Sequence, residues 1–90
     1  MSLLDNIRNY YEKWVVEEIE AQVKENQFSE NRLTDVVCVA LNHLPPRYIR
    51  HEVDMAFYLS PQEYQEMRDK VAKAVAMAIA YVKKHENDRG

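Results

Sequence analysis

Two adjacent prolines, Pro45 and Pro46, constrain the fold of this 90-residue chain more than any other feature. They follow an apolar run at residues 36–41, which its helical spacing assigns to a buried helix. A residue that precedes proline is disfavoured in the helical region, so this helix is expected to end at Leu44. A buried helix that ends in a rigid turn holds the next side chain, Arg47, in a fixed position.

Length and composition indicate one small globular domain, residues 1–90. Chains of this size bury only about two-thirds of their unfolded surface, so a lone monomer is expected to be marginally stable. The hydrophobic fraction of 47 % is too high for a disordered chain. The net charge of −3 argues against non-specific binding to duplex nucleic acid, which requires a basic surface.

Several classes of protein are excluded by residue types that the sequence lacks. A single cysteine, Cys38, permits no intrachain disulfide and no cysteine-based zinc site. Glycine occurs only as Gly90, so neither a phosphate-binding glycine loop nor a nucleophile elbow can form. The longest strongly apolar stretch, residues 71–82, is shorter than a membrane span and contains Lys73. No signal peptide is readable, and the chain is predicted to be cytoplasmic.

The first two helices are predicted from apolar residues at spacings of three and four. The first is expected to begin near Leu3, with Ser2 as its cap, and to run to about Lys24. Its apolar stripe comprises Ile7, Tyr11, Trp14, Val15, Ile19 and Val23. A polar loop at residues 25–31 leads to the second helix, whose stripe comprises Leu33, Val36, Val37, Ala40, Leu41 and Leu44. Cys38 lies within this apolar helix and is expected to be a small core residue.

The third helix has an almost complete start signal. Ser60 is the cap, Pro61 takes the first helical position, and Glu63 closes a capping box. The expected core stripe comprises Tyr64, Met67, Val71, Val75, Ala78 and Val82. A second face, formed by Ala72, Ala76 and Ala80, makes the helix apolar nearly all round. Because so short a chain has too few elements to cover this helix, we expect a homodimer with this helix at its interface and the first helix as a further candidate for that surface.

Between Tyr48 and Leu59 the apolar period changes to two, which favours an extended, half-buried strand. A single strand needs a pairing partner, and a second copy of the chain is the simplest one. A short helix would also fit Val53, Ala56 and Phe57, so both alternatives stay open. The predicted fold class is therefore mainly α, with three helices and an extended or short β connector between the second and third.

No catalytic constellation emerges from the sequence. The histidines, His43, His51 and His85, have no helical partners that would complete a metal site, and are expected to lie at the surface or in turns. No nucleophile is paired with a base, and most carboxylates belong to solvated helix faces. The residues therefore predict no enzyme, no metal and no cofactor.

Arg47 and Arg50 form the strongest candidate binding site. Two arginines that emerge from a fixed turn can chelate a phosphate or the edge of guanine, while a tyrosine stacks on a base. The candidate ligand-binding residues are Arg47, Tyr48, Arg50, Asn42, Tyr58 and Arg32. In the alternative interpretation, these arginines pair with Asp35, Glu52 or Asp54 as ordinary surface charges.

Residues 35–48, Asp-Val-Val-Cys-Val-Ala-Leu-Asn-His-Leu-Pro-Pro-Arg-Tyr, resemble the signature of the late competence development protein ComFB family. The likeness extends to Tyr10-Tyr11-Glu12, to residues 50–55 and to Leu59-Ser60. It implies a small, mainly helical, dimeric bacterial protein without known enzymatic activity. Some members bind cyclic dinucleotide second messengers. Others bind zinc through a cysteine cluster, a pattern from which this chain, with only Cys38, departs.

Two functions are expected from these features. The first is a homodimeric regulatory protein that binds a cyclic dinucleotide, cyclic di-GMP or cyclic di-AMP, near the Pro-Pro-Arg-Tyr turn. The second is a dimeric interaction module that recruits an unidentified protein partner and has no small-molecule ligand. The acidic first helix and the surplus apolar surface fit this second function equally well.

Overall fold

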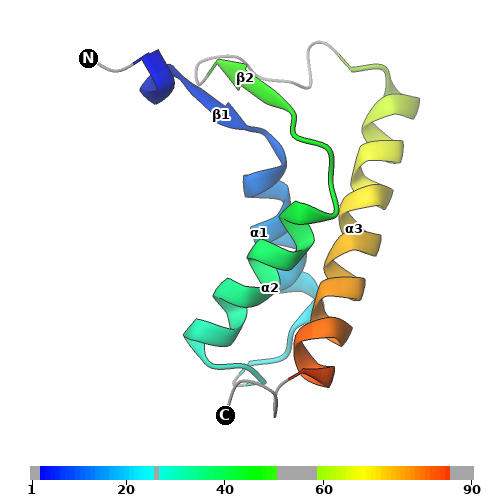
Figure 1. Ribbon diagram of the computed structural model, residues 1–90. Coiled ribbons are helices and arrows are strands. Elements are labelled where there is room, and N and C mark those ends of the chain that lie inside the picture. The colour runs from blue at the N-terminus through cyan, green and yellow to red at the C-terminus, as the bar shows by residue number, and fades with distance from the viewer. Residues whose placement is uncertain (1–2, 26, 51–58, 86–90) are drawn as a thin grey trace.

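The computed structural model describes residues 3–25, 27–50 and 59–85, and within them the chain is mainly helical (Figure 1). The elements in chain order are a 3-10 helix η1 (Leu3–Asn6), β1 (Ile7–Asn9), α1 (Tyr11–Gln22), α2 (Glu30–Asn42), β2 (Tyr48–Arg50) and α3 (Pro61–Lys84). The three predicted helices are confirmed. Among the described residues, no helix has both the length and the apolar character that crossing a membrane requires.

The prediction that the first helix begins near Leu3 was wrong, because α1 begins at Tyr11. Residues 7–9 instead pair with β2 in an antiparallel register that places Ile7 opposite Arg50 and Asn9 opposite Tyr48. This pairing takes up backbone groups that a helix would have used. The spacing of apolar residues alone did not reveal it, since the partner strand lies far along the chain.

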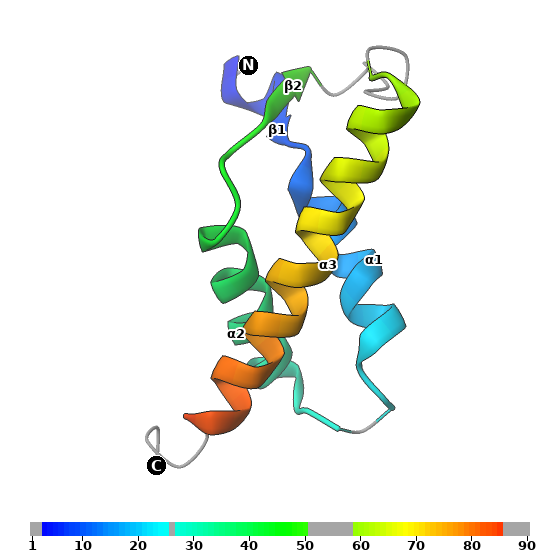
Figure 2. The same ribbon diagram turned by 90° about the vertical axis from the view of Figure 1, so that its right-hand side faces the viewer.

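The extended start of the connector is confirmed by β2, but its partner is β1 of the same chain and not the second copy suggested above. The rest of the alternating segment, residues 51–58 with Tyr58, lies outside the described residues. The choice between strand and short helix there stays open. The small sheet lies at one end of the helices, remote from the carboxyl-terminal end of α3 (Figures 1 and 2).

Each of the two longer helices, α2 and α3, begins with a serine cap, and the capping box predicted for α3 is confirmed. At the start of α3, the Ser60 hydroxyl accepts from the Glu63 backbone N–H at 3.1 Å, and the Glu63 carboxylate accepts from the Ser60 N–H at 3.3 Å. Pro61 takes the first helical position, as predicted. At the start of α2, the Ser29 hydroxyl accepts from the Arg32 N–H at 3.2 Å, so this helix begins within the stretch predicted as a loop.

The core lies where the three helices meet (Figure 2). Its buried residues are Tyr10, Tyr11, Trp14, Val15, Ile19, Val36, Ala40, Leu44, Met67, Val71, Ala74, Val75, Ala78 and Val82. Trp14 joins α1 to α3, because its ring meets the Tyr64 ring edge-on at 5.3 Å between centroids. Arg68 lies over the same indole at 5.1 Å and reaches Glu17 at 3.5 Å.

The structure corrects two burial predictions. Cys38 is exposed, because it lies on the side of α2 opposite the buried residues Val36 and Ala40. Tyr64, expected in the core stripe of α3, is 40 % exposed despite its contact with Trp14. The other expected residues of that stripe are buried.

The second face of α3 is uncovered in the single chain. Ala76 and Ala80 are exposed, and Met77 and Tyr81 beside them are each 51 % exposed. This is the surface that the sequence assigned to a dimer interface. The homodimer stays a prediction that rests on this uncovered surface.

Candidate ligand-binding site

Two hydrogen bonds hold the Pro-Pro-Arg turn against the start of α1, and a third, within the start of α1, positions Asn9. The side-chain carbonyl of Asn9 accepts from the backbone N–H of Arg47 at 3.0 Å and from that of Tyr11 at 3.3 Å. The Arg47 carbonyl in turn accepts from the Tyr10 N–H at 2.6 Å. Because both sides of the Arg47 backbone are bonded, the position from which its side chain leaves is well defined.

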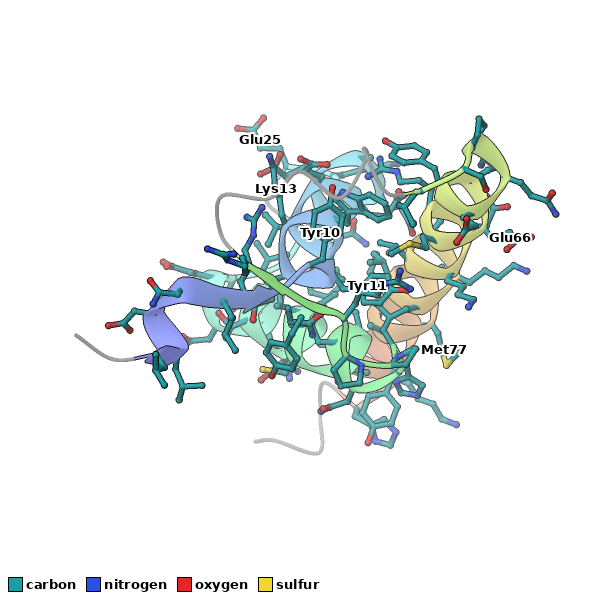
Figure 3. All side chains as sticks on the ribbon, turned by 90° about the horizontal axis from the view of Figure 1, so that it is seen from above. Tyr10, Tyr11, Lys13, Glu25, Glu66 and Met77 are labelled. Atoms are coloured by element: carbon teal, nitrogen blue, oxygen red, sulfur yellow. The ribbon has the colours of Figure 1, made fainter. Side chains whose placement is uncertain are left out.

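A polar pocket of about 230 Å³ lies between this turn and α3. Its lining residues are Tyr11, Pro45, Pro46, Arg47, Glu63, Glu66, Met67 and Lys70. Tyr11 and Met67 are buried and form the floor, while the charged residues are exposed at the rim. In the view from above, Tyr11 lies between the helices and Glu66 projects outward from α3 (Figure 3).

The two cations of this polar pocket stand on opposite walls, Arg47 on the turn and Lys70 on α3. Neither forms an ion pair with another described residue. The carboxylates are partly engaged, because Glu63 accepts from Ser60 and Glu66 accepts from Gln62 at 3.1 Å. The pocket therefore offers one guanidinium and one ammonium group, which an anion can contact from two sides.

A second, more apolar pocket of about 320 Å³ lies on the other side of Pro45. It is lined by His43, Leu44, Pro45, Lys70, Lys73, Ala74 and Met77. Pro45 and Lys70 belong to both pockets, so the two are neighbours that share one ammonium group. The two pockets lie side by side along α3, and the ammonium group of Lys70 lies where they meet.

His43 caps the carboxyl end of α2 and lines the apolar pocket, and a hydrogen bond fixes the protonation of one of its ring nitrogens. Its Nδ1 lies 2.8 Å from the Val39 carbonyl oxygen, which can only accept a hydrogen bond. The proton of the neutral ring is therefore on Nδ1. Nε2 is left with a lone pair and has no hydrogen bond to a described residue.

Of the candidate residues predicted from the sequence, Arg47 lines the polar pocket. Tyr48 and Arg50 follow on β2, where alternation places them on one face of the strand, and both are exposed. Asn42 is the exposed last residue of α2 and precedes His43. The structure thus keeps these four residues around one turn.

Arg32 is placed elsewhere. It lies in the first turn of α2, about 15 Å from Asn42 for a helix of normal rise, and its guanidinium is 4.0 Å from the Asp35 carboxylate. It lines a different pocket, of about 110 Å³, together with Asp35, Cys38, Val39, Tyr81, Val82 and His85. For Arg32, the ion pair with Asp35 is the pairing that the alternative interpretation names.

The contribution of α3 to the two pockets was not predicted from the sequence. Glu63, Glu66, Lys70, Lys73 and Met77 recur at spacings of three and four, which places them along one flank of the buried stripe. That spacing could have identified them as neighbours on the helix. It could not show that this flank faces the Pro-Pro-Arg turn. Within the described residues, no three side chains of His, Cys, Asp or Glu gather as metal ligands.

The fold and the pockets define a small, mainly helical domain with two cations, Arg47 and Lys70, around an open pocket. The family model of the late competence development protein ComFB matches residues 8–86, and the chain belongs to this family. The matched range includes all residues of both pockets. Searches of curated proteins and of solved structures found no match. Family membership supports a competence-related regulatory protein, in a family not known for enzymes.

Proposed function

We propose that this protein is a non-enzymatic, cytoplasmic and homodimeric receptor that binds a cyclic dinucleotide at the Pro-Pro-Arg-Tyr turn. The observation that carries the proposal is the pair of neighbouring pockets with Lys70 between them and Arg47 on the facing wall. A cyclic dinucleotide has two bases joined through two phosphates. Such a ligand matches two compartments separated by positive charge.

The pocket volumes agree with this division. Pockets for whole drug-sized ligands usually measure about 300–1,000 Å³. The polar pocket, at about 230 Å³, is smaller than that range, and the apolar pocket, at about 320 Å³, is at its lower end. Each is therefore suited to one base, with the sugar–phosphate ring lying across Pro45.

In the proposed complex, Arg47 and Lys70 contact phosphate oxygens from opposite sides. Charge-assisted hydrogen bonds of this kind are about twice as strong as neutral ones. Tyr48, whose side chain is 65 % exposed directly after Arg47, supplies an open ring for stacking. Asn42 and Arg50 flank the turn as further polar contacts. Arg32 has no part in this site.

The test is a calorimetric titration with cyclic di-GMP and cyclic di-AMP at moderate salt, using wild type, Arg47→Ala and Arg32→Ala. Saturable binding is expected in the wild type and in Arg32→Ala. Arg47→Ala should lower the affinity by about tenfold to a hundredfold, since it removes a hydrogen bond to a charged group. Binding that is equally strong in Arg47→Ala would refute this site.

The second candidate function is a dimeric protein-interaction module. The exposed side chains of Met77 and Tyr81 on α3 favour it, because large apolar residues clustered at a surface mark contacts between proteins. Sedimentation distinguishes whether this surface binds a second copy of the chain or another protein. A dimer dissociated by Met77→Glu would assign this surface to the second copy, whereas an unaffected dimer would leave it for another protein.

A further inference from the structure

The apolar pocket is lined by His43 at the end of α2 and by Lys70 and Lys73 of α3. Among its described lining residues these are the titratable groups, and none is a carboxylate. Leu44, Pro45, Ala74 and Met77 provide the apolar remainder. The nearest acidic side chains of the neighbouring pocket, Glu63 and Glu66, line its other walls beyond Lys70. An apolar floor with three basic groups at its edge suits a flat ligand that carries phosphate.

The hydrogen bonding of His43 decides how it can meet such a ligand. Because Nδ1–H donates to the Val39 carbonyl, the neutral ring can offer only the lone pair of Nε2. A lone pair is repelled by phosphate oxygen. After protonation, Nε2–H becomes a charged donor, while the bond to Val39 is kept. The same ring therefore changes from an unfavourable to a favourable contact by gaining one proton.

We propose that His43, Lys70 and Lys73 form a phosphate subsite for the second half of the ligand, and that binding there is coupled to proton uptake on Nε2 of His43. This inference rests on the proposed function and adds that ligand binding is regulated by pH. Linkage requires that a ligand which favours the protonated ring binds more tightly as the pH falls. Anion affinity at this subsite thus increases as the pH falls and decreases as the pH rises.

The proton uptake is measured by calorimetry with cyclic di-GMP and cyclic di-AMP near pH 7, in two buffers of different ionisation enthalpy. Wild type should take up a fraction of a proton per ligand. His43→Asn should abolish the uptake, because its amide can still donate to Val39 but offers no titrating nitrogen. It should also weaken binding at about pH 6 by roughly tenfold. His85→Asn, at the other end of α3, is the matched control and should behave as wild type.

Two contrary results are distinguishable. Binding without net proton uptake, or uptake that persists in His43→Asn, would overturn the subsite and leave the proposed function standing. If neither cyclic dinucleotide binds, the proposed function fails, and the subsite is tested with pyrophosphate by following the imidazole resonances. A pyrophosphate-induced shift of the His43 ring but not of the His85 ring would support the subsite by itself. The absence of such a shift would overturn it as well.

Discussion

The two ends of the α2–α3 pair contain similar residue types but form different surfaces. At the far end, the pocket of about 110 Å³ holds Arg32, whose guanidinium faces Asp35 on the same helix, and His85, whose ring is 4.4 Å from that of Tyr81. At the turn end, Arg47 and His43 line larger pockets of about 230 and 320 Å³. Arg32 lies within a helix and pairs with a carboxylate three residues further along. Arg47 lies in a proline turn and forms no ion pair with a described residue.

The difference lies in how each cation is positioned. Helical spacing brings Arg32 and Asp35 together, so the charge of Arg32 is offset by a neighbouring carboxylate. The turn end depends on Asn9, which accepts from two backbone N–H groups and holds Arg47 opposite Lys70. Arg47 and Lys70 form no ion pair with a described residue, so both are able to contact a ligand. The comparison can be tested by substitutions made in pairs, one at each end.

The largest effect on binding is expected from charge reversal at Lys70, which both pockets share. Lys70→Glu should weaken cyclic dinucleotide binding by at least about a hundredfold, because an attraction is replaced by a repulsion. Lys83→Glu, on the same helix near its far end, should leave the affinity unchanged. Equal losses in both variants would show that only the total charge matters. Calorimetry at two salt concentrations provides the comparison.

A smaller effect is expected from Asn9→Ala. Two backbone N–H groups lose their acceptor, so unfolding in urea should require about 1–2 kcal/mol less free energy. Ligand affinity should fall by roughly tenfold, because Arg47 is no longer held in place. The matched far-end variant is Thr34→Ala, which removes an exposed hydrogen bond to the Glu30 carbonyl and should cost less than about 0.5 kcal/mol. Unchanged affinity in Asn9→Ala would show that the turn is rigid without this side chain.

Removing negative charge from the polar pocket should strengthen anion binding modestly. Glu63→Gln keeps the capping box, since glutamine also serves at that position, and Glu66→Gln keeps an acceptor for Gln62. Each should raise the affinity for a cyclic dinucleotide by about twofold to fivefold at low salt. A loss of affinity instead would mean that these carboxylates contact the bases of the ligand. Titrations with both nucleotides detect either result.

The smallest effect is expected at the far end, from modification of Cys38. Its exposed thiol should react with a thiol reagent in the folded protein, without denaturant. Alkylation should change the free energy of unfolding by less than about 0.5 kcal/mol and leave ligand affinity unchanged. A thiol that reacts only after unfolding would contradict the exposure of Cys38 on α2.

Local interactions were readable from the sequence wherever they join residues a few positions apart. The cap at Ser60, the end of α2 before Pro45 and the buried stripe from Met67 to Val82 depend on such neighbours, and all are present. The start of α1 was missed because strand pairing with β2 competes with helix formation at Ile7–Asn9. Periodicity contains no information about that distant partner.

The sequence by itself determined the helical class, the rigid turn and the family, since each depends on the identity or order of nearby residues. The tertiary structure alone decided that Asn9 holds Arg47, that Lys70 faces it across a pocket and that Arg32 lies apart. These relations join residues tens of positions apart in the chain. Such residues become neighbours only when the buried stripes of the three helices pack together, because burial of that apolar surface sets which flank of α3 meets the turn.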